Sequence, residues 1–326
     1  MPRLPILAAA LTMTALPALA APKVVTDMSP TGALVQEVMG DLGEVHVLLP
    51  RAASAHQYTM RPSDARALQG ADLLVWMGPE LTPWLDKSAA NLADQTQQLR
   101  LLSVEGTILQ DYAEDEDDHA GHDDHGTHDD HDHEAHDHDH DHDHDHDHDH
   151  EGHDHNGVDP HAWLNPQNAA PWLQGIAAAL AEQDPQNAST YQANADAAAK
   201  RIAELDATLS DQLAPWSDAS FVVFHDAYSY FTRHFGLNSA VALSLGDATT
   251  PSAARVQMVR EQVVDSGAVC AFPEYAHDPA LLTTVVEGTG TRIGGELSPE
   301  GADGDATRYD DILTGLADTL VECFEG

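Results

Sequence analysis

The sequence predicts an α/β protein with two lobes, each a four-stranded, mainly parallel sheet flanked by helices, joined by one long connecting helix. Three observations support this fold class. Short apolar runs alternate with helical patterns in the first third of the chain. The same alternation returns after residue 220, and a long helical pattern at 185–213 separates the two stretches.

The chain begins with a pattern typical of a secretory signal peptide. Arg3 gives a charged start, residues 4–19 are apolar or small, and Ala18-Leu-Ala20 is a small-x-small cleavage site. A membrane-spanning helix needs roughly 20 uninterrupted apolar residues, whereas Pro5 and Pro17 interrupt this run. We expect cleavage after Ala20 and export of a mature chain of about 306 residues, which is long enough for two lobes.

In the first half of the chain, four apolar runs read as strands. These strands are expected at 24–26, 45–49, 72–76 and 99–104. Helices between them are expected at 34–39, 62–68 and 81–92. Pro62 suits the first turn of its helix, and Pro50 and Gly78-Pro79 stop the strands before them. Because strand and helix alternate, the sheet should be parallel.

Two helical stretches follow, at 168–182 and 185–213. The longer one carries a sustained apolar stripe from Tyr191 to Leu209, and its Ala, Gln, Lys and Glu residues favour helix. About 25 helical residues would span on the order of 35–40 Å, which suits a rigid connector between lobes. An ordinary amphipathic surface helix is the alternative.

The last part of the chain repeats the alternation. Strands are expected at 220–224, 240–243, 268–272 and 292–297, and helices at 225–235, 251–266, 279–287 and 307–323. The predicted division is a signal peptide (1–20), an N-terminal lobe (21–184) that includes a disordered His/Asp-rich loop (113–157), a linking helix (185–214) and a C-terminal lobe (215–326).

The loop at 113–157 has an extreme composition. It holds 16 of the 22 histidines and 20 of the 55 acidic residues, with no Lys or Arg. Nothing in it can bury apolar surface, so we expect disorder. Imidazole is a common ligand for late first-row metals, and such tracts are typical of metal binding. A purely solubilising charge run is the alternative.

Charge and cysteine content restrict the class of protein further. The net charge is −41, and the 35 acidic residues outside the loop still outnumber the 14 basic ones, which argues against nucleic acid as a partner. A cationic ligand or a dedicated receptor fits better. Cys270 and Cys323 are the two cysteines, and in an exported chain we expect them to form a disulfide; two buried thiols are the alternative.

Three isolated histidines share a position at the boundary of an expected element. His56 lies in the loop after a strand, His161 precedes a helix, and His225 directly follows an apolar strand. Ligands of open α/β sheets bind at the carboxyl ends of strands, and zinc accepts three imidazole nitrogens. A lone histidine at such a position is more often a hydrogen-bonded polar group than a metal ligand. The prediction of a zinc site therefore depends on all three histidines sharing this position.

The other residues near this predicted site are weaker candidates. Among histidines these are His46, His234 and His277. Partners for the second nitrogen of a ligating imidazole are expected nearby in sequence. Candidate partners are Asp159, Asn165 and Asp226.

Four motifs, in order around the His-rich loop, give the chain a family resemblance. It resembles the periplasmic zinc-binding subunits of bacterial zinc ABC transporters, the ZnuA-like proteins. The motifs are His56-Gln-Tyr-Thr-Met-Arg61-Pro62-Ser-Asp64, Ala71-Asp-Leu-Leu-Val-Trp-Met-Gly-Pro-Glu80, Asp159-Pro-His-Ala-Trp-Leu-Asn-Pro166 and Phe224-His-Asp-Ala-Tyr-Ser-Tyr-Phe231. The resemblance covers essentially the whole mature chain. It implies a metal in the cleft between two lobes, ligands at His56, His161 and His225, and a bridge between Cys270 and Cys323.

Two positions depart from patterns common in this family. Ala55 stands where some zinc members carry an acid, and Ser298 stands where many related receptors place an aspartate ligand. The fourth ligand therefore stays open between a water, Glu274, Glu296 and a histidine of the loop. A site dominated by nitrogen still favours zinc over manganese, which prefers oxygen.

The resemblance implies a periplasmic solute-binding protein that captures Zn²⁺ and delivers it to an ABC permease for high-affinity uptake. The sequence contains no Gly-x-x-x-x-Gly-Lys-Ser/Thr, so the ATPase must be a separate subunit. We expect a monomer without enzymatic activity, whose His-rich loop binds additional zinc. The alternatives are a standalone periplasmic zinc buffer or metallochaperone, a zinc hydrolase, and a manganese-specific receptor.

Overall fold

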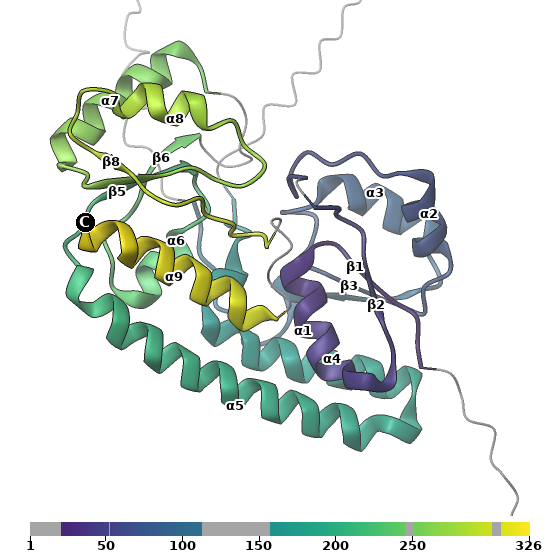
Figure 1. The fold of residues 1–326 in the computed structure, drawn as a ribbon. Helices are drawn as coiled ribbons and strands as arrows, with labels where there is room; N and C mark the ends of the chain where they lie inside the picture. Colours follow the sequence, from purple (N-terminus) through teal and green to yellow (C-terminus); the bar gives the residue numbers. More distant parts are fainter. Residues whose placement is uncertain (1–20, 52, 113–156, 245–250, 302–307) are drawn as a thin grey trace, which may run out of the picture.

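The computed structural model describes residues 21–51, 53–112, 157–244, 251–301 and 308–326, with two sheets and a long helix beneath them (Figure 1). The predicted signal peptide and nearly all of the His-rich loop lie outside the described residues. No helix in the described part of the chain is long and apolar enough to cross a membrane.

The first sheet has the four parallel strands that the sequence predicts. Its strands are β1 (Val24–Thr26), β2 (Val45–Val47), β3 (Leu73–Trp76) and β4 (Gln97–Arg100), in the order β2-β1-β3-β4. The predicted fourth strand at 99–104 is misplaced. The strand begins at polar Gln97, because an edge strand stays partly exposed, and Leu101–Ser103 forms a 3₁₀ turn that buries Leu101 and Leu102.

The second sheet repeats this arrangement. Its strands are β5 (Phe221–His225), β6 (Val241–Ser244), β7 (Cys270–Phe272) and β8 (Arg292–Ile293), all parallel, in the order β6-β5-β7-β8. Strand β8 is shorter than predicted, although a separate parallel bridge joins Glu274 to Leu297. His225 is the last residue of β5 rather than the residue after it.

Nine α-helices lie within the described residues. They are α1 (Ser29–Met39), α2 (Pro62–Gln69), α3 (Pro83–Leu92), α4 (Ala169–Gln183), α5 (Ala188–Leu213), α6 (Ser229–Phe235), α7 (Ala253–Ser266), α8 (Pro279–Val286) and α9 (Tyr309–Glu325). Helix α1 begins five residues before the predicted start at Leu34, because its first turn contains Pro30, Thr31 and Gly32, which give no apolar stripe.

Helices cover both faces of each sheet (Figure 1). Helices α2 and α3 pack on the outer face of the first sheet, and α7 and α8 pack on the outer face of the second. The two inner faces share one continuous apolar core with α1, α4, α5 and α9. This shared core makes the two halves of the protein pack as one body.

Helix α5 connects the two halves and runs beneath both sheets (Figure 1). Its buried residues are Tyr191, Ala195, Ala198, Ile202, Leu209 and Leu213. They form the stripe that the sequence predicts, with Leu205 partly buried beside it. The connecting-helix prediction is therefore confirmed, whereas the division into lobes at residues 184 and 214 stays a prediction.

A disulfide joins Cys270 of β7 to Cys323 of α9, as the sequence predicts. Its two cysteines are 53 residues apart in the chain, and both are buried. The bond attaches the last helix to the centre of the second sheet.

Arg201 of α5 connects three helices through ion pairs. Its Nε lies 2.6 Å from Asp310 of α9, and its Nη2 lies 2.7 Å from Glu37 of α1. We expect Arg201→Met to lower the free energy of unfolding by about 1–3 kcal/mol, because two poorly exposed carboxylates lose a partner. Urea denaturation measures this change.

Lys200→Met is the matched control one position away. Among the described residues, Lys200 pairs with Glu204 alone, at 3.7 Å on the exposed face of the same helix. Such a pair contributes about 0.5 kcal/mol or less. Equal effects of the two substitutions would show that Arg201 does not connect the helices energetically.

Candidate metal centre

Three histidines converge between the two sheets. His56 lies in the loop between β2 and α2, His161 directly precedes a 3₁₀ turn (Ala162–Leu164), and His225 ends β5. One ring nitrogen of each lies within 4.8 Å of the other two. His161 and His225 are buried, and His56 is partly exposed.

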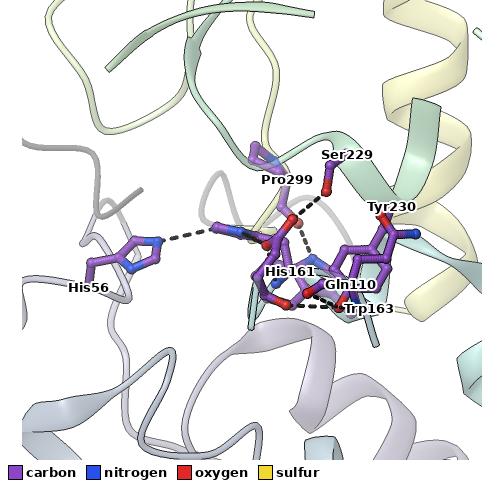
Figure 2. A network of polar contacts seen from close by, with 8 residues as sticks. His56, Gln110, His161, Trp163, Ser229, Tyr230 and Pro299 are labelled. Atoms are coloured by element: carbon purple, nitrogen blue, oxygen red, sulfur yellow. Dashed lines mark hydrogen bonds and ion pairs between the residues drawn. The ribbon is translucent and has the colours of Figure 1, made fainter. Parts of the chain in front are cut away.

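Two ring nitrogens of this group lie close together. His56 Nε2 and His161 Nε2 are 3.3 Å apart, and a dashed line marks this contact in Figure 2. Zinc–nitrogen bonds of 2.0–2.1 Å at a tetrahedral angle place two ligand nitrogens about 3.3–3.4 Å apart. The pair therefore has the separation that one shared zinc ion requires.

A buried carboxylate holds the ring of His161. Asp159 Oδ1 lies 2.7 Å from His161 Nδ1 and also accepts the backbone N–H of His161. Ser229 donates to the other oxygen of Asp159, and the Tyr230 hydroxyl donates to the Asp159 carbonyl at 2.9 Å (Figure 2). With Nδ1 donating to Asp159, the lone pair of Nε2 faces His56. Asp159, one of the predicted partners, thus orients the ring.

A second buried carboxylate holds the ring of His225. Glu274 Oε2 contacts His225 Nδ1, while Glu274 Oε1 accepts from the backbone N–H groups of Phe224 and His225 and from the Tyr228 hydroxyl. Glu274 is one of the predicted candidates for the fourth ligand, and here its carboxylate contacts Nδ1 of His225 rather than Nε2. Of the other predicted partners, Asn165 instead accepts from the N–H of Gln167.

His225 Nε2 is buried and has no hydrogen-bond partner among the described residues. An unsatisfied buried nitrogen is costly unless it binds something. Burial disfavours protonation of His225, but Glu274 outweighs this and raises its pKa to about 9. Burial, with His161 and His225 as neighbours, lowers the pKa of His56 well below its usual value. Because a metal ion binds the deprotonated ring nitrogen, zinc and protons compete at this site.

Glu300 is a residue of this site that the sequence did not reveal. Its side chain is 7% exposed, and its Oε2 accepts from the backbone N–H of Ala55, the residue before His56, at 3.4 Å. Burial raises the pKa of Glu300, although His225 and His161 oppose this. The one sequence feature that could have indicated it is that Glu300 is an acidic residue two positions after Ser298, where many related receptors place an aspartate ligand. Glu296, another predicted candidate ligand, is exposed and is not part of either group of potential metal ligands among the described residues.

The weaker histidine candidates lie in three different places. His46 is exposed on β2, and His234 of α6 pairs with Asp206 at 2.6 Å. His277 is different, since its ring lies 5.8 Å from that of His225 and one of its nitrogens falls in a second group with Glu274 and His225.

Comparison with known proteins assigns the chain to a family. The profile of the ZnuA family, described as zinc-uptake complex component A, periplasmic, matches residues 24–323. The chain belongs to this family. The resemblance first noted from the motifs around His56, His161 and His225 is therefore confirmed.

Relatives of this family are similar over nearly their whole length. A protein of Paracoccus denitrificans called high-affinity zinc uptake system protein ZnuA is 52% identical over 321 residues, which cover 98% of this chain and 97% of that protein. The protein of the same name from Yersinia pestis is 32% identical and covers 94% of this chain and 92% of its own.

Solved structures with low sequence identity share the fold. The Mn-bound periplasmic metal binding protein of candidatus liberibacter asiaticus superposes with a TM-score of 0.70 at 22% identity, covering 92% of this chain and 98% of its own. A mutant of the laminin-binding adhesin of Streptococcus agalactiae gives 0.72 at 22% identity, with coverages of 93% and 99%. These matches support the predicted two-lobed α/β fold.

Proposed function

We propose that this chain captures Zn²⁺ in the periplasm with His56, His161 and His225 and delivers it to the permease of an ABC transporter. The observation that carries the proposal is the buried, unpartnered Nε2 of His225 beside two imidazole nitrogens 3.3 Å apart. Two relatives that are similar over nearly the full length are named zinc uptake proteins, which supports zinc as the ion that is bound.

The chemistry of the three ligands favours zinc among divalent cations. Three imidazoles form a nitrogen site, whereas manganese and magnesium prefer oxygen ligands. Asp159 and Glu274 accept from the second nitrogen of two of the rings, which fixes their tautomer and increases the basicity of the nitrogen toward the metal. The fourth position stays open for water or a carboxylate.

Delivery requires a partner that supplies energy. The sequence has no phosphate-binding loop, so a separate ATPase drives transport through the permease. Because the two halves share one core and one long helix, we propose small motions around the site rather than a wide opening. The chain acts as a monomeric receptor and not as an enzyme.

Zinc-limited growth tests this function. In host cells that lack the chromosomal copy, the intact chain should restore growth and zinc accumulation under chelation, while the His161→Ala variant should not. A standalone zinc buffer predicts a different result, because zinc uptake would then be unchanged by removing the protein. Equal uptake with and without the chain would overturn the receptor proposal.

Glu274→Gln should weaken zinc binding by about 10–100-fold, as expected when the partner of a ligating histidine is lost. Without the carboxylate, the ring of His225 loses the contact that fixes its tautomer. Competition with a chromophoric chelator measures the affinity. Glu296→Gln is the matched control, because this nearby side chain is exposed and should leave the affinity unchanged. A loss equal to that of His161→Ala would make Glu274 a direct ligand instead.

A further inference from the structure

A second group of potential metal ligands lies beside the three-histidine centre. Single atoms of His225, Glu274 and His277 lie within 4.8 Å of one another. The same residues line one small pocket together with Glu300. His225 and Glu274 are buried, whereas His277 is partly exposed. The pocket thus joins the buried His225 of the centre to the partly exposed His277.

Glu274 has an oxygen with capacity left for a cation. Its Oε1 accepts three hydrogen bonds, from two backbone N–H groups and the Tyr228 hydroxyl. Among the described residues, its Oε2 contacts His225 Nδ1 alone, and a carboxylate oxygen offers two lone pairs. One lone pair of Oε2 therefore remains for a metal ion that His277 also binds.

The backbone directs His277 toward this pocket. Ala276, directly before it, has a φ of 72° and is the one non-glycine residue with positive φ found in the described chain. Such a conformation is costly and collects at functional sites. The imidazole of His277 stacks on Phe224, with ring centroids 4.3 Å apart, and its backbone N–H donates to the Glu274 carbonyl at 3.2 Å. These two contacts hold the ring in place and involve neither of its nitrogens.

We propose that His277 and Glu274, with Glu300 on the pocket wall, form a transit site through which a divalent zinc ion passes between solvent and the three-histidine centre. The inference rests on the proposed function, since it needs the centre to hold zinc. The transit site has one imidazole and carboxylate oxygens, so it binds the ion more weakly than three imidazoles do. The two groups share His225, whose ring centroid lies 5.8 Å from that of His277, so an ion has a short distance to move between them.

The kinetics of zinc capture and removal test this proposal. Trp163 lies against His161, with ring centroids 5.2 Å apart, so its fluorescence should report zinc in the centre. Stopped-flow mixing of the full chain with less than one equivalent of zinc gives the capture rate, and mixing of the loaded chain with EDTA gives the removal rate. A transit site lowers the kinetic barrier both to zinc entry into the centre and to zinc release from it. His277→Phe should therefore slow both rates at least about threefold and leave the equilibrium affinity unchanged.

Matched variants separate the ligand role from packing. His277→Phe keeps an aromatic ring against Phe224 but has no metal-binding nitrogen. His277→Asp has a metal-binding oxygen but no ring. We therefore expect His277→Asp, and not His277→Phe, to have the wild-type rates. His46→Ala removes an exposed histidine far from the pocket and should leave both rates unchanged. The His-rich loop is the same in all variants, so its contribution cancels.

Two results would overturn the transit site. Rates of His277→Phe equal to those of wild type would show that zinc does not pass His277. A weaker equilibrium affinity, with faster removal, would make His277 a ligand or support of the tight site instead. Failure of the proposed function would be a separate result. In that case the His161→Ala variant would still show the fluorescence change of tight zinc binding.

Discussion

The His161→Ala variant should lose tight zinc binding, with an affinity reduced by more than about 100-fold. Loss of a residue that only orients a ligand already costs about 10–100-fold, so loss of a ligand should cost more. The side chain is fully buried, and its Nε2 lies 3.3 Å from that of His56. Calorimetric titration of metal-free protein measures the affinity and the number of bound ions.

Controls for this titration separate the centre from the His-rich loop. A variant without residues 119–155 should keep one tight zinc ion and lose only weaker ones, because the three histidines lie outside that segment. His46→Ala is the matched point control, since this exposed histidine is far from the centre. If the tight phase disappeared with the loop and persisted in His161→Ala, the loop would be the principal site and the buffer function would replace the receptor.

Replacing both Cys270 and Cys323 with alanine should lower the free energy of unfolding by about 4 kcal/mol. The disulfide closes a segment of 53 residues, and the chain-entropy estimate for a loop of that length is about 4 kcal/mol, within a usual range of 2–5. The bond joins β7 to α9, so its loss should release the last helix from the sheet that carries His225. Guanidinium denaturation followed by circular dichroism measures the change.

Wild-type protein treated with reductant is the matched control for the double cysteine variant, since it loses the bond but keeps both sulfur atoms. Both samples should denature at similarly lowered midpoints, and zinc should raise both midpoints because it binds only the folded chain. A change below about 1 kcal/mol in both would show that the shared core alone holds α9 in place.

Much of the fold followed from local patterns in the sequence. The stripe from Tyr191 to Leu209 predicted α5, since helical periodicity needs no tertiary context. Buried strands such as β3 and β5 are continuous apolar runs and were located within one residue. The edge strand β4 was misplaced and β8 was predicted too long, because their residues are partly or fully exposed and carry little apolar signal.

The candidate site was only partly predictable. His56, His161 and His225 were selected because each lies at an element boundary, and the fold brings these boundaries together; their role as ligands stays a prediction. Glu300 was missed because the fold brings it to Ala55, which is 245 positions away in the chain. The role of Glu274 likewise depends on the parallel pairing of β5 and β7, which brings its carboxylate to the ring of His225.

The most direct test of the central claim is a crystal structure of the full chain loaded with one equivalent of zinc, with anomalous diffraction at the zinc edge. The account predicts one dominant peak, about 2.0–2.1 Å from Nε2 of His56, His161 and His225, in tetrahedral geometry. A dominant peak elsewhere, with the three rings still unliganded, would contradict it.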